Sequence, residues 1–140
     1  MLQLGPPPEL VAAPVDPFVA SFTGGNLLRG HATARANGLT EVTLEDGTIF
    51  YSVDPAVGSV GLVVYPWEVS VARQAVVDSA LNHVAAPISS LVPLGNRVRV
   101  RIGPLVAEVT TESADQLALE RGETVVASFK ATATRLVPLA

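Results

Sequence analysis

Short runs of alternating apolar and polar residues constrain the fold of this chain more than any other feature of its sequence. The clearest run is residues 97–102, where Val98, Val100 and Ile102 alternate with three arginines. A period of two places the apolar side chains on one face of a β-strand. Similar runs, separated by turn residues such as Asp46-Gly47 and Gly103-Pro104, cover residues 39–44, 48–51, 58–64, 69–71, 105–109, 124–130 and 134–137. Short strands at this spacing predict small β-barrels.

One segment departs from the β pattern and predicts a short helix over residues 111–120. Ala114, Leu117 and Ala118 follow one another at helical spacing. Thr111 has the side chain of an N-cap residue, and Gly122 is expected to end the helix. The sequence therefore predicts an all-β chain with one short helix.

The β runs form two similar units. Asn26-Leu27-Leu28 in the first stands where Asn82-His83-Val84 stands in the second, and Tyr65-Pro66 stands where Lys130-Ala131 stands. The second unit is longer by a stretch that carries the expected helix. Neither unit is long enough to bury a sizeable core alone, so we expect the two to complete one another or a neighbouring chain.

The first 25 residues differ from both units. Gly5-Pro6-Pro7-Pro8, Pro14 and Pro17 leave room for only a short helical turn around residues 9–13, and Gly24-Gly25 breaks the chain. We therefore divide the chain into a linker arm (1–25), a first repeat (26–73) and a second repeat (74–140). Residues 72–81 form a crossing segment between the repeats that is compatible with either helix or extended chain.

The composition excludes several classes of function. Hydrophobic residues make up 49% of the 140 residues and charged residues only 16%, which favours self-association or docking onto a partner. The net charge of −4 and the lack of a basic run give no basis for nucleic-acid binding. The absence of cysteine excludes disulfides and a thiol nucleophile, and is compatible with the cytoplasm. Neither a signal peptide nor a membrane helix is expected.

No enzyme motif is present. The chain has no GxxxxGK[ST] phosphate loop, so it is not expected to hydrolyse ATP by itself. His31 and His83 stand alone, which favours surface or strand histidines over metal ligands. Glu108 and Glu112 are expected to be solvated. The arginines of residues 97–102 are compatible with an anion-binding surface, but an ordinary exposed strand face is favoured.

A set of small polar residues suits a tetrahedral oxyanion. Such an anion is bound by hydroxyls, backbone N–H groups and one or two positive charges, and a helix N-terminus adds donors. The candidates are Ser79 and Asn82 at the entry of the second repeat, Thr110, Thr111 and Ser113 at the helix start, and Lys130, Ala131 and Thr132 near the closing strand. The alternative is an ordinary structural role, because Ser and Thr are common on strands and in caps.

Two groups of motifs resemble ABC importer ATP-binding proteins. Gly5-Pro6-Pro7-Pro8-Glu9-Leu10, Pro17-Phe18-Val19-Ala20-Ser21-Phe22 and Gly25-Asn26-Leu27-Leu28 resemble the end of the ATPase domain and the start of its regulatory tail. Ser79-Ala80-Leu81-Asn82, Thr110-Thr111-Glu112-Ser113, Leu117-Ala118-Leu119, Gly122-Glu123 and Ser128-Phe129-Lys130-Ala131-Thr132 resemble the molybdate-binding Mop/TOBE domain. The matches span nearly the whole chain.

The resemblance implies tandem OB-like TOBE/Mop barrels that form a homodimer or higher oligomer. It implies a molybdate or tungstate site, at an interface between Mop units, formed by Ser79, Asn82, Thr111, Ser113, Lys130, Ala131 and Thr132. It further implies a cytoplasmic protein, peripheral to the inner membrane, whose partners are an ATPase domain and a membrane permease, and no other cofactor. One departure weakens the expected site: Leu81 stands where the family carries an arginine, which removes a charge-assisted donor.

Three functions agree with these observations. The first is a regulatory oxyanion-sensing domain of an importer ATPase, cut from it or encoded apart from it. The second is a stand-alone molybdate storage protein of the di-Mop type. The third is a structural TOBE tail of another importer, for sugar or sulfate, that binds no anion.

Overall fold

The computed structural model describes residues 26–75 and 77–139, and these are almost entirely β-structure. The linker arm of residues 1–25, with its expected helical turn, lies outside the described residues. The elements are β1 (Asn26–Ala34), β2 (Thr40–Leu44), β3 (Ile49–Ser52), β4 (Gly58–Val64), η1 (Pro66–Glu68), β5 (Ser70–Ala72), β6 (Asn82–Leu94), β7 (Arg97–Ile102), β8 (Leu105–Thr110), α2 (Thr111–Leu117), β9 (Thr124–Phe129), η2 (Ala131–Ala133) and β10 (Arg135–Pro138). The prediction of an all-β chain with one short helix is confirmed for this part of the chain.

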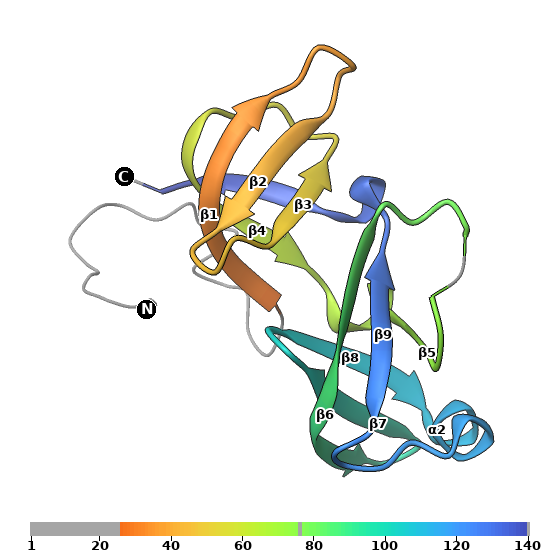
Figure 1. The fold of residues 1–140 in the computed structure, drawn as a ribbon. Helices are drawn as coiled ribbons and strands as arrows, with labels where there is room; N and C mark the ends of the chain where they lie inside the picture. The colour runs from red at the N-terminus through yellow and green to blue at the C-terminus, as the bar shows by residue number, and fades with distance from the viewer. Residues whose placement is uncertain (1–25, 76, 140) are drawn as a thin grey trace.

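The strands form two sheets that repeat the same arrangement (Figure 1). One has the order β10-β4-β1-β2-β3 and the other β5-β9-β6-β7-β8, so each strand of the first unit has a counterpart five strands later. The 3-10 turns correspond as well, because η1 follows β4 and η2 follows β9. The extra length of the second unit lies between β8 and β9, where α2 is inserted.

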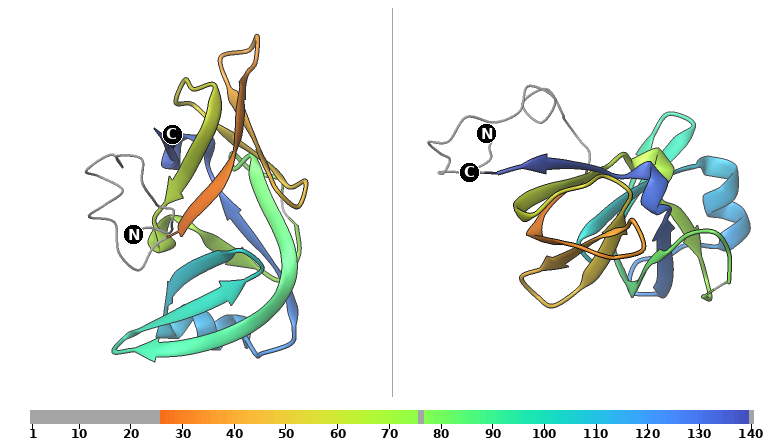
Figure 2. Two further views of the ribbon diagram at one scale, coloured as in Figure 1. Left: turned by 90° about the vertical axis from the view of Figure 1, so that its left-hand side faces the viewer. Right: turned by 90° about the horizontal axis from the view of Figure 1, so that it is seen from above.

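The two units exchange their last strands. β5, from the first unit, pairs antiparallel with β9, and β10, from the second unit, pairs antiparallel with β4. Figure 2 shows β10 running from η2 back along the first sheet. Each sheet therefore needs a strand from the other half of the sequence, and neither half completes its sheet alone.

One hydrophobic core is continuous through both units. Phe50 of β3 and Phe129 of β9 pack edge to face, with ring centroids 5.0 Å apart and an angle of 62° between the rings. Val42 and Leu62 of the first unit and Val100 of the second belong to the same buried cluster. Both units thus remove their apolar faces from water together, as their short length requires.

Two asparagines connect the units by the same contact. Asn82, at the start of β6, accepts from the Tyr51 N–H (2.7 Å) and donates to the Tyr51 carbonyl (3.0 Å). Asn26, at the start of β1, accepts from the Val106 N–H (2.7 Å) and donates to the Val106 carbonyl (2.8 Å). Both asparagines are buried. Tyr51 and Val106 lie on β3 and β8, which are edge strands, so each amide satisfies peptide groups that would otherwise be left open.

The helix is present but its ends differ from the sequence prediction. Thr110, and not Thr111, is the N-cap, and its hydroxyl accepts from the Ser113 N–H at 3.0 Å. The helix ends at Ala118, which adopts the left-handed conformation with φ 51°. Gly122 does not end the helix: with φ 90° it turns the chain toward β9, and its N–H donates to the Ile88 carbonyl. Thr110 and Thr111 are adjacent and both have side chains suited to an N-cap, so the sequence did not distinguish between them.

The expectation that Glu108 is solvated is wrong. Its side chain is only 5% exposed and bridges Arg97 (2.7 Å) and Arg99 (3.1 Å) on the neighbouring strand β7. The register places Arg99 directly opposite Glu108, so the two charges pair across the strands. Sequence alone did not give this register.

The segment after β5 is neither helix nor strand in its described residues, 73–75 and 77–81. Arg73 anchors its start to the second unit: the guanidinium donates to the Leu117 carbonyl (2.7 Å) and pairs with Glu123 (2.9 Å). The hydrogen bond from Arg73 lowers the pKa of the Glu123 carboxyl. Across the described residues, no helix combines the length and apolarity that crossing a membrane requires.

We predict that Asn82→Ala destabilises the protein far more than Asn37→Ala. Removing the Asn82 amide leaves the Tyr51 N–H and carbonyl without partners, at a cost of about 2–4 kcal/mol. Asn37 is exposed and accepts one hydrogen bond from the Leu39 N–H in a turn, so its loss costs about 0.5–1 kcal/mol. The free energy of unfolding, from urea denaturation, measures both. An equal loss of unfolding free energy in the two variants would show that the Asn82 contact between the units stabilises the protein no more than an exposed turn does.

Candidate functional site

Two of the residues predicted from sequence share one pocket. Ser79 and Lys130 both line a pocket of about 220 Å³. The remaining lining residues come from η1, β5, the segment before β6, β9 and η2, and they are Glu68, Ser70, Asp78, Ala80, Ser128, Phe129 and Ala133. The pocket therefore depends on the strand exchange, because Glu68 and Ser70 belong to the first unit and the other residues to the second.

A short hydrogen-bond network shapes the segment that carries Ser79. The Asp78 carboxylate accepts from the Ala80 N–H at 2.9 Å and turns the chain around Ser79. The imidazole Nε2 of His83 lies 2.9 Å from the Ala80 carbonyl oxygen. The Nδ1 of the same ring lies 2.7 Å from the Ser128 hydroxyl. His83 thus connects the segment to β9.

The opposite side of the pocket is held by β9 and β5. Ser128 is paired with His83 on β6 and with Ser70 on β5, and the Ser70 hydroxyl donates to the Ser128 carbonyl at 3.2 Å. Lys130 is the extended residue that precedes η2. Within the described part of the chain, neither the Lys130 ammonium nor the Ser79 hydroxyl has a hydrogen-bond or ion-pair partner. Both are available to a ligand.

The charge in the pocket is mixed. Lys130 supplies one positive charge, whereas Glu68 and Asp78 supply two negative charges. A divalent oxyanion gains from the ammonium and from the serine hydroxyls but is repelled by the carboxylates. Leu81, at the position of the family's arginine, is 50% exposed beside this segment and adds no charge.

The side chain of Asn82 holds the two units together and is not free to bind a ligand. Its side chain is 1% exposed, and its oxygen and nitrogen are both bonded to the Tyr51 backbone. Ala131 and Thr132 lie in η2, directly after Lys130; Ala131 is buried and Thr132 is exposed. None of these three lines the pocket that contains Ser79 and Lys130.

Thr111 and Ser113 are separated from this pocket by the length of β9. They lie in α2, which precedes β9, whereas Lys130 follows it, and Figure 1 shows α2 and η2 at opposite ends of that strand. Two donors of the helix start are already used, because the Thr111 N–H donates to the Asn96 carbonyl and the Ser113 N–H to the Thr110 hydroxyl. A single chain therefore does not gather all the predicted site residues at one point.

Sequence reasoning missed several residues of the pocket. Glu68, Ser70 and Asp78 were not candidates, because only the strand exchange brings η1 and β5 beside Lys130. Ser128 lies in a motif used for the family resemblance but was not assigned to the site. His83 was expected to be an ordinary surface or strand histidine, and its bond to Ser128 depends on the β6–β9 register.

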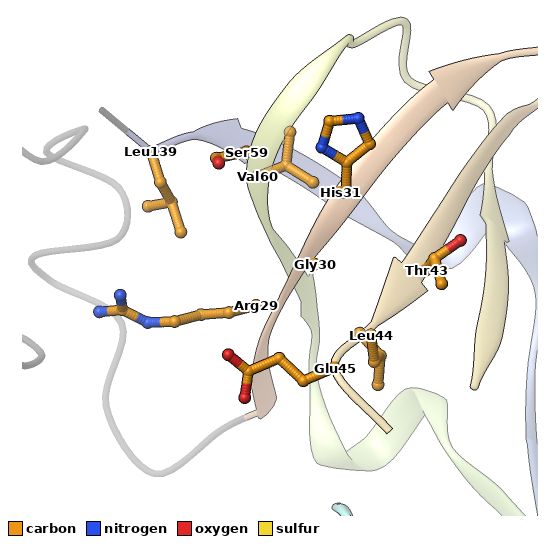
Figure 3. Close-up of a pocket in the computed structure, with 9 residues that line it drawn as sticks. All are labelled: Arg29, Gly30, His31, Thr43, Leu44, Glu45, Ser59, Val60 and Leu139. Atoms are coloured by element: carbon orange, nitrogen blue, oxygen red, sulfur yellow. The ribbon is translucent and has the colours of Figure 1, made fainter. Parts of the chain in front are cut away.

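Two further depressions on the described residues, 26–75 and 77–139, do not assemble convergent polar groups. A depression of about 590 Å³ lies beside β1 and is lined by Arg29, His31, Glu45 and Ser59, among others. Figure 3 shows Arg29 and His31 pointing in different directions from the same strand. A further depression, of about 320 Å³, is lined by Arg99, Arg101 and the apolar Val92 and Leu94. In residues 26–75 and 77–139, no three His, Asp or Glu side chains are grouped to hold a metal ion.

One family model matches the second half of the chain. Residues 78–136 match the model of the TOBE domain. The second half of this chain is thus similar to a TOBE domain. The matched range includes Ser79, His83, Ser128 and Lys130, so most of the pocket lies within that range and the first unit completes it.

Two importer proteins are similar over nearly the whole chain. The molybdate/tungstate import ATP-binding protein WtpC of Pyrococcus abyssi (strain GE5 / Orsay) is 33% identical over 144 residues, covering 97% of this chain and 39% of the relative. The sulfate/thiosulfate import ATP-binding protein CysA of Mycolicibacterium paratuberculosis (strain ATCC BAA-968 / K-10) is 29% identical over 143 residues, covering 98% of this chain and 32% of the relative. The chain thus spans about a third of the length of these curated relatives.

A solved structure has the same fold. The cytoplasmic molybdate-binding protein ModG, in a crystal form with molybdate bound, matches with a TM-score of 0.75 at 19% sequence identity, covering 85% of this chain and 99% of ModG. The predicted pair of small OB-like β-barrels is confirmed by this match and by the two five-stranded sheets.

We predict that Asp78→Asn raises the affinity of the pocket for a divalent oxyanion. The asparagine oxygen still accepts from the Ala80 N–H, so the turn around Ser79 is retained while one negative charge is lost. The expected gain is on the order of threefold to tenfold, from removing a charge several ångströms from the anion. Calorimetric titration with tungstate measures it. An unchanged or lower affinity would show that the anion does not bind near Asp78.

Proposed function

We propose that this chain is the regulatory part of an ABC importer ATP-binding protein and that it binds molybdate or tungstate. The carrying observation is the WtpC match, which covers 97% of the chain at 33% identity. The fold shared with molybdate-binding ModG supports the same ligand class. Molybdate and tungstate are nearly equal in size, shape and charge, so both are expected to bind.

In this proposal Ser79 and Lys130 contact the anion from one chain. The ammonium of Lys130 supplies charge-assisted hydrogen bonds, and Ser79 and its backbone supply neutral donors. The hydroxyls of Thr111 and Ser113, at the far end of β9, are contributed by a second copy, so the complete site forms in a dimer. Ala131 and Thr132 follow Lys130 in η2 and hold it in place from outside the pocket, and Asn82 positions the segment that carries Ser79.

Anion binding would report the cytoplasmic oxyanion concentration to the transporter. The proposed partners are an ATPase domain and, through it, a membrane permease, which places the protein at the inner face of the membrane. The regulatory part performs no catalysis in this proposal. ATP hydrolysis belongs to the ATPase domain, whose phosphate loop this chain lacks.

A structural TOBE tail that binds no group 6 oxyanion is the second candidate. Two observations favour it: the CysA match at 29% identity, and the two carboxylates beside Lys130. A stand-alone storage protein, which the ModG fold also fits, is the third.

Calorimetric titration with molybdate, tungstate and sulfate tests the proposal. We expect saturable binding of molybdate and tungstate, little binding of sulfate, and at least a tenfold loss of affinity in Lys130→Ala because one charge-assisted contact is removed. Arg121→Ala is the matched control: it removes one positive charge from an exposed residue outside the pocket and should leave binding unchanged.

The two alternative functions, a structural tail and a storage protein, predict different results in these experiments. Sulfate binding in preference to molybdate would identify a sulfate importer tail, and flat traces for all three anions would leave a structural tail. A closed oligomer holding several molybdate ions per assembly, with no response when added to an ATPase domain, would identify a storage protein.

A further inference from the structure

We propose that His83 and Ser128 form a proton-controlled switch that sets whether the pocket offers a donor or an acceptor to an oxyanion. The inference rests on the proposed function and adds its regulation: oxyanion binding takes up a proton at His83 and strengthens as the pH falls. The observation that carries it is the pair of contacts made by the His83 ring, one to Ala80 and one to Ser128.

The Ala80 contact fixes the tautomer of neutral His83. A backbone carbonyl oxygen only accepts hydrogen bonds, so the ring nitrogen 2.9 Å away, Nε2, carries a hydrogen. A neutral imidazole has one N–H, and Nδ1 is therefore an acceptor. Nδ1 lies 2.7 Å from the Ser128 hydroxyl, which must then donate its only hydrogen to the ring.

With neutral His83, Ser128 is a poor ligand for an anion. Its hydrogen points at the ring, so the hydroxyl has only lone pairs left to offer an anion in the pocket that Ser128 lines with Ser79 and Lys130. The two carboxylates of the same pocket, Glu68 and Asp78, add further repulsion. In this state one ammonium and one serine hydroxyl face two negative charges.

Protonation of His83 reverses the direction of the hydrogen bond between His83 and Ser128. The imidazolium has two N–H groups, so Nε2 keeps its bond to Ala80 while Nδ1 becomes a donor to the Ser128 oxygen. The Ser128 hydrogen is then free to turn into the pocket and donate to an oxyanion. The imidazolium also adds a positive charge, which opposes Glu68 and Asp78. Both changes stabilise the bound dianion.

The direction of the linkage follows from this geometry. The bound anion favours the imidazolium, so it raises the proton affinity of His83, and by reciprocity protonation raises the anion affinity. Affinity should therefore increase as the pH falls through the range where imidazole ordinarily titrates, by up to about tenfold per pH unit for one linked proton. The other ionisable groups that line the pocket are Glu68, Asp78 and Lys130.

The test is a calorimetric titration with tungstate from about pH 6 to about pH 8.5, in buffers of different ionisation enthalpy. Wild-type protein should take up a proton on binding and bind more tightly at the lower pH. His83→Gln should bind with a nearly flat pH profile. His31→Gln removes the other histidine, which is outside this pocket, and should keep the wild-type profile.

Ser128→Ala separates the switch from a simple charge effect. It keeps the His83 charge but removes the hydroxyl, so its pH profile should be much flatter than that of wild type. A Ser128→Ala profile as steep as wild type would overturn the switch and leave only electrostatic attraction. Thermal melting of each variant confirms that it is folded.

Two results separate this inference from the proposed function. Tungstate binding with the same affinity at every pH would overturn the switch and leave the oxyanion function intact, whereas no binding at any pH would overturn both. The nitrogen NMR spectrum of the imidazole gives a test without ligand. Neutral His83 should carry its hydrogen on Nε2, and a hydrogen on Nδ1 would overturn the switch.

Discussion

The rest of the structure depends on two asparagine side chains whose amides form the hydrogen bonds that a neighbouring strand's backbone would otherwise form. Asn82 offers one acceptor and one donor to the two peptide groups of Tyr51, and Asn26 offers the same to Val106. An amide is the one side chain whose donor and acceptor match a strand edge in this way. Each contact closes an open edge of one sheet with the first residue of the other unit's β1 or β6, and it fixes how the two sheets meet.

The strand exchange builds on that junction and makes the two units inseparable. β5 and β10 leave their own units, and Phe50 and Phe129 join the cores. Short units gain a larger common core, which a single unit of this size does not supply. As a consequence, both units line the pocket. Glu68 and Ser70 come from η1 and the exchanged strand β5 of the first unit, whereas Ser128 and Lys130 come from β9 and the residue that follows it in the second unit.

The two units keep a common scaffold but carry different side chains on it. Tyr65 precedes η1 in the conformation that Lys130 adopts before η2, with φ and ψ of −74° and 145° against −80° and 147°. Tyr65 stacks on the exposed Trp67, with ring centroids 4.7 Å apart, so an aromatic pair stands where the second unit has an ammonium and a threonine. Only the second unit combines Lys130 with Ser128 and Ser79, and the hydrogen-bonded His83 belongs to the same unit.

The sequence by itself determined the elements of this protein. Alternation and turn residues located most strands within one or two residues, and the correspondence of Asn26 with Asn82 and of Tyr65 with Lys130 revealed the repeat, because these signals are local. Short motifs, which are also local, made Ser79 and Lys130 candidates, and the structure places both in one pocket. Only the tertiary structure decided the rest: the exchange of β5 and β10, the register that pairs Glu108 with two arginines, and the meeting of Glu68, Asp78, His83 and Ser128 around the pocket. Those outcomes depend on which distant strands pair and at which offset, and a period of two in the sequence fixes the faces of a strand but neither its neighbour nor its register.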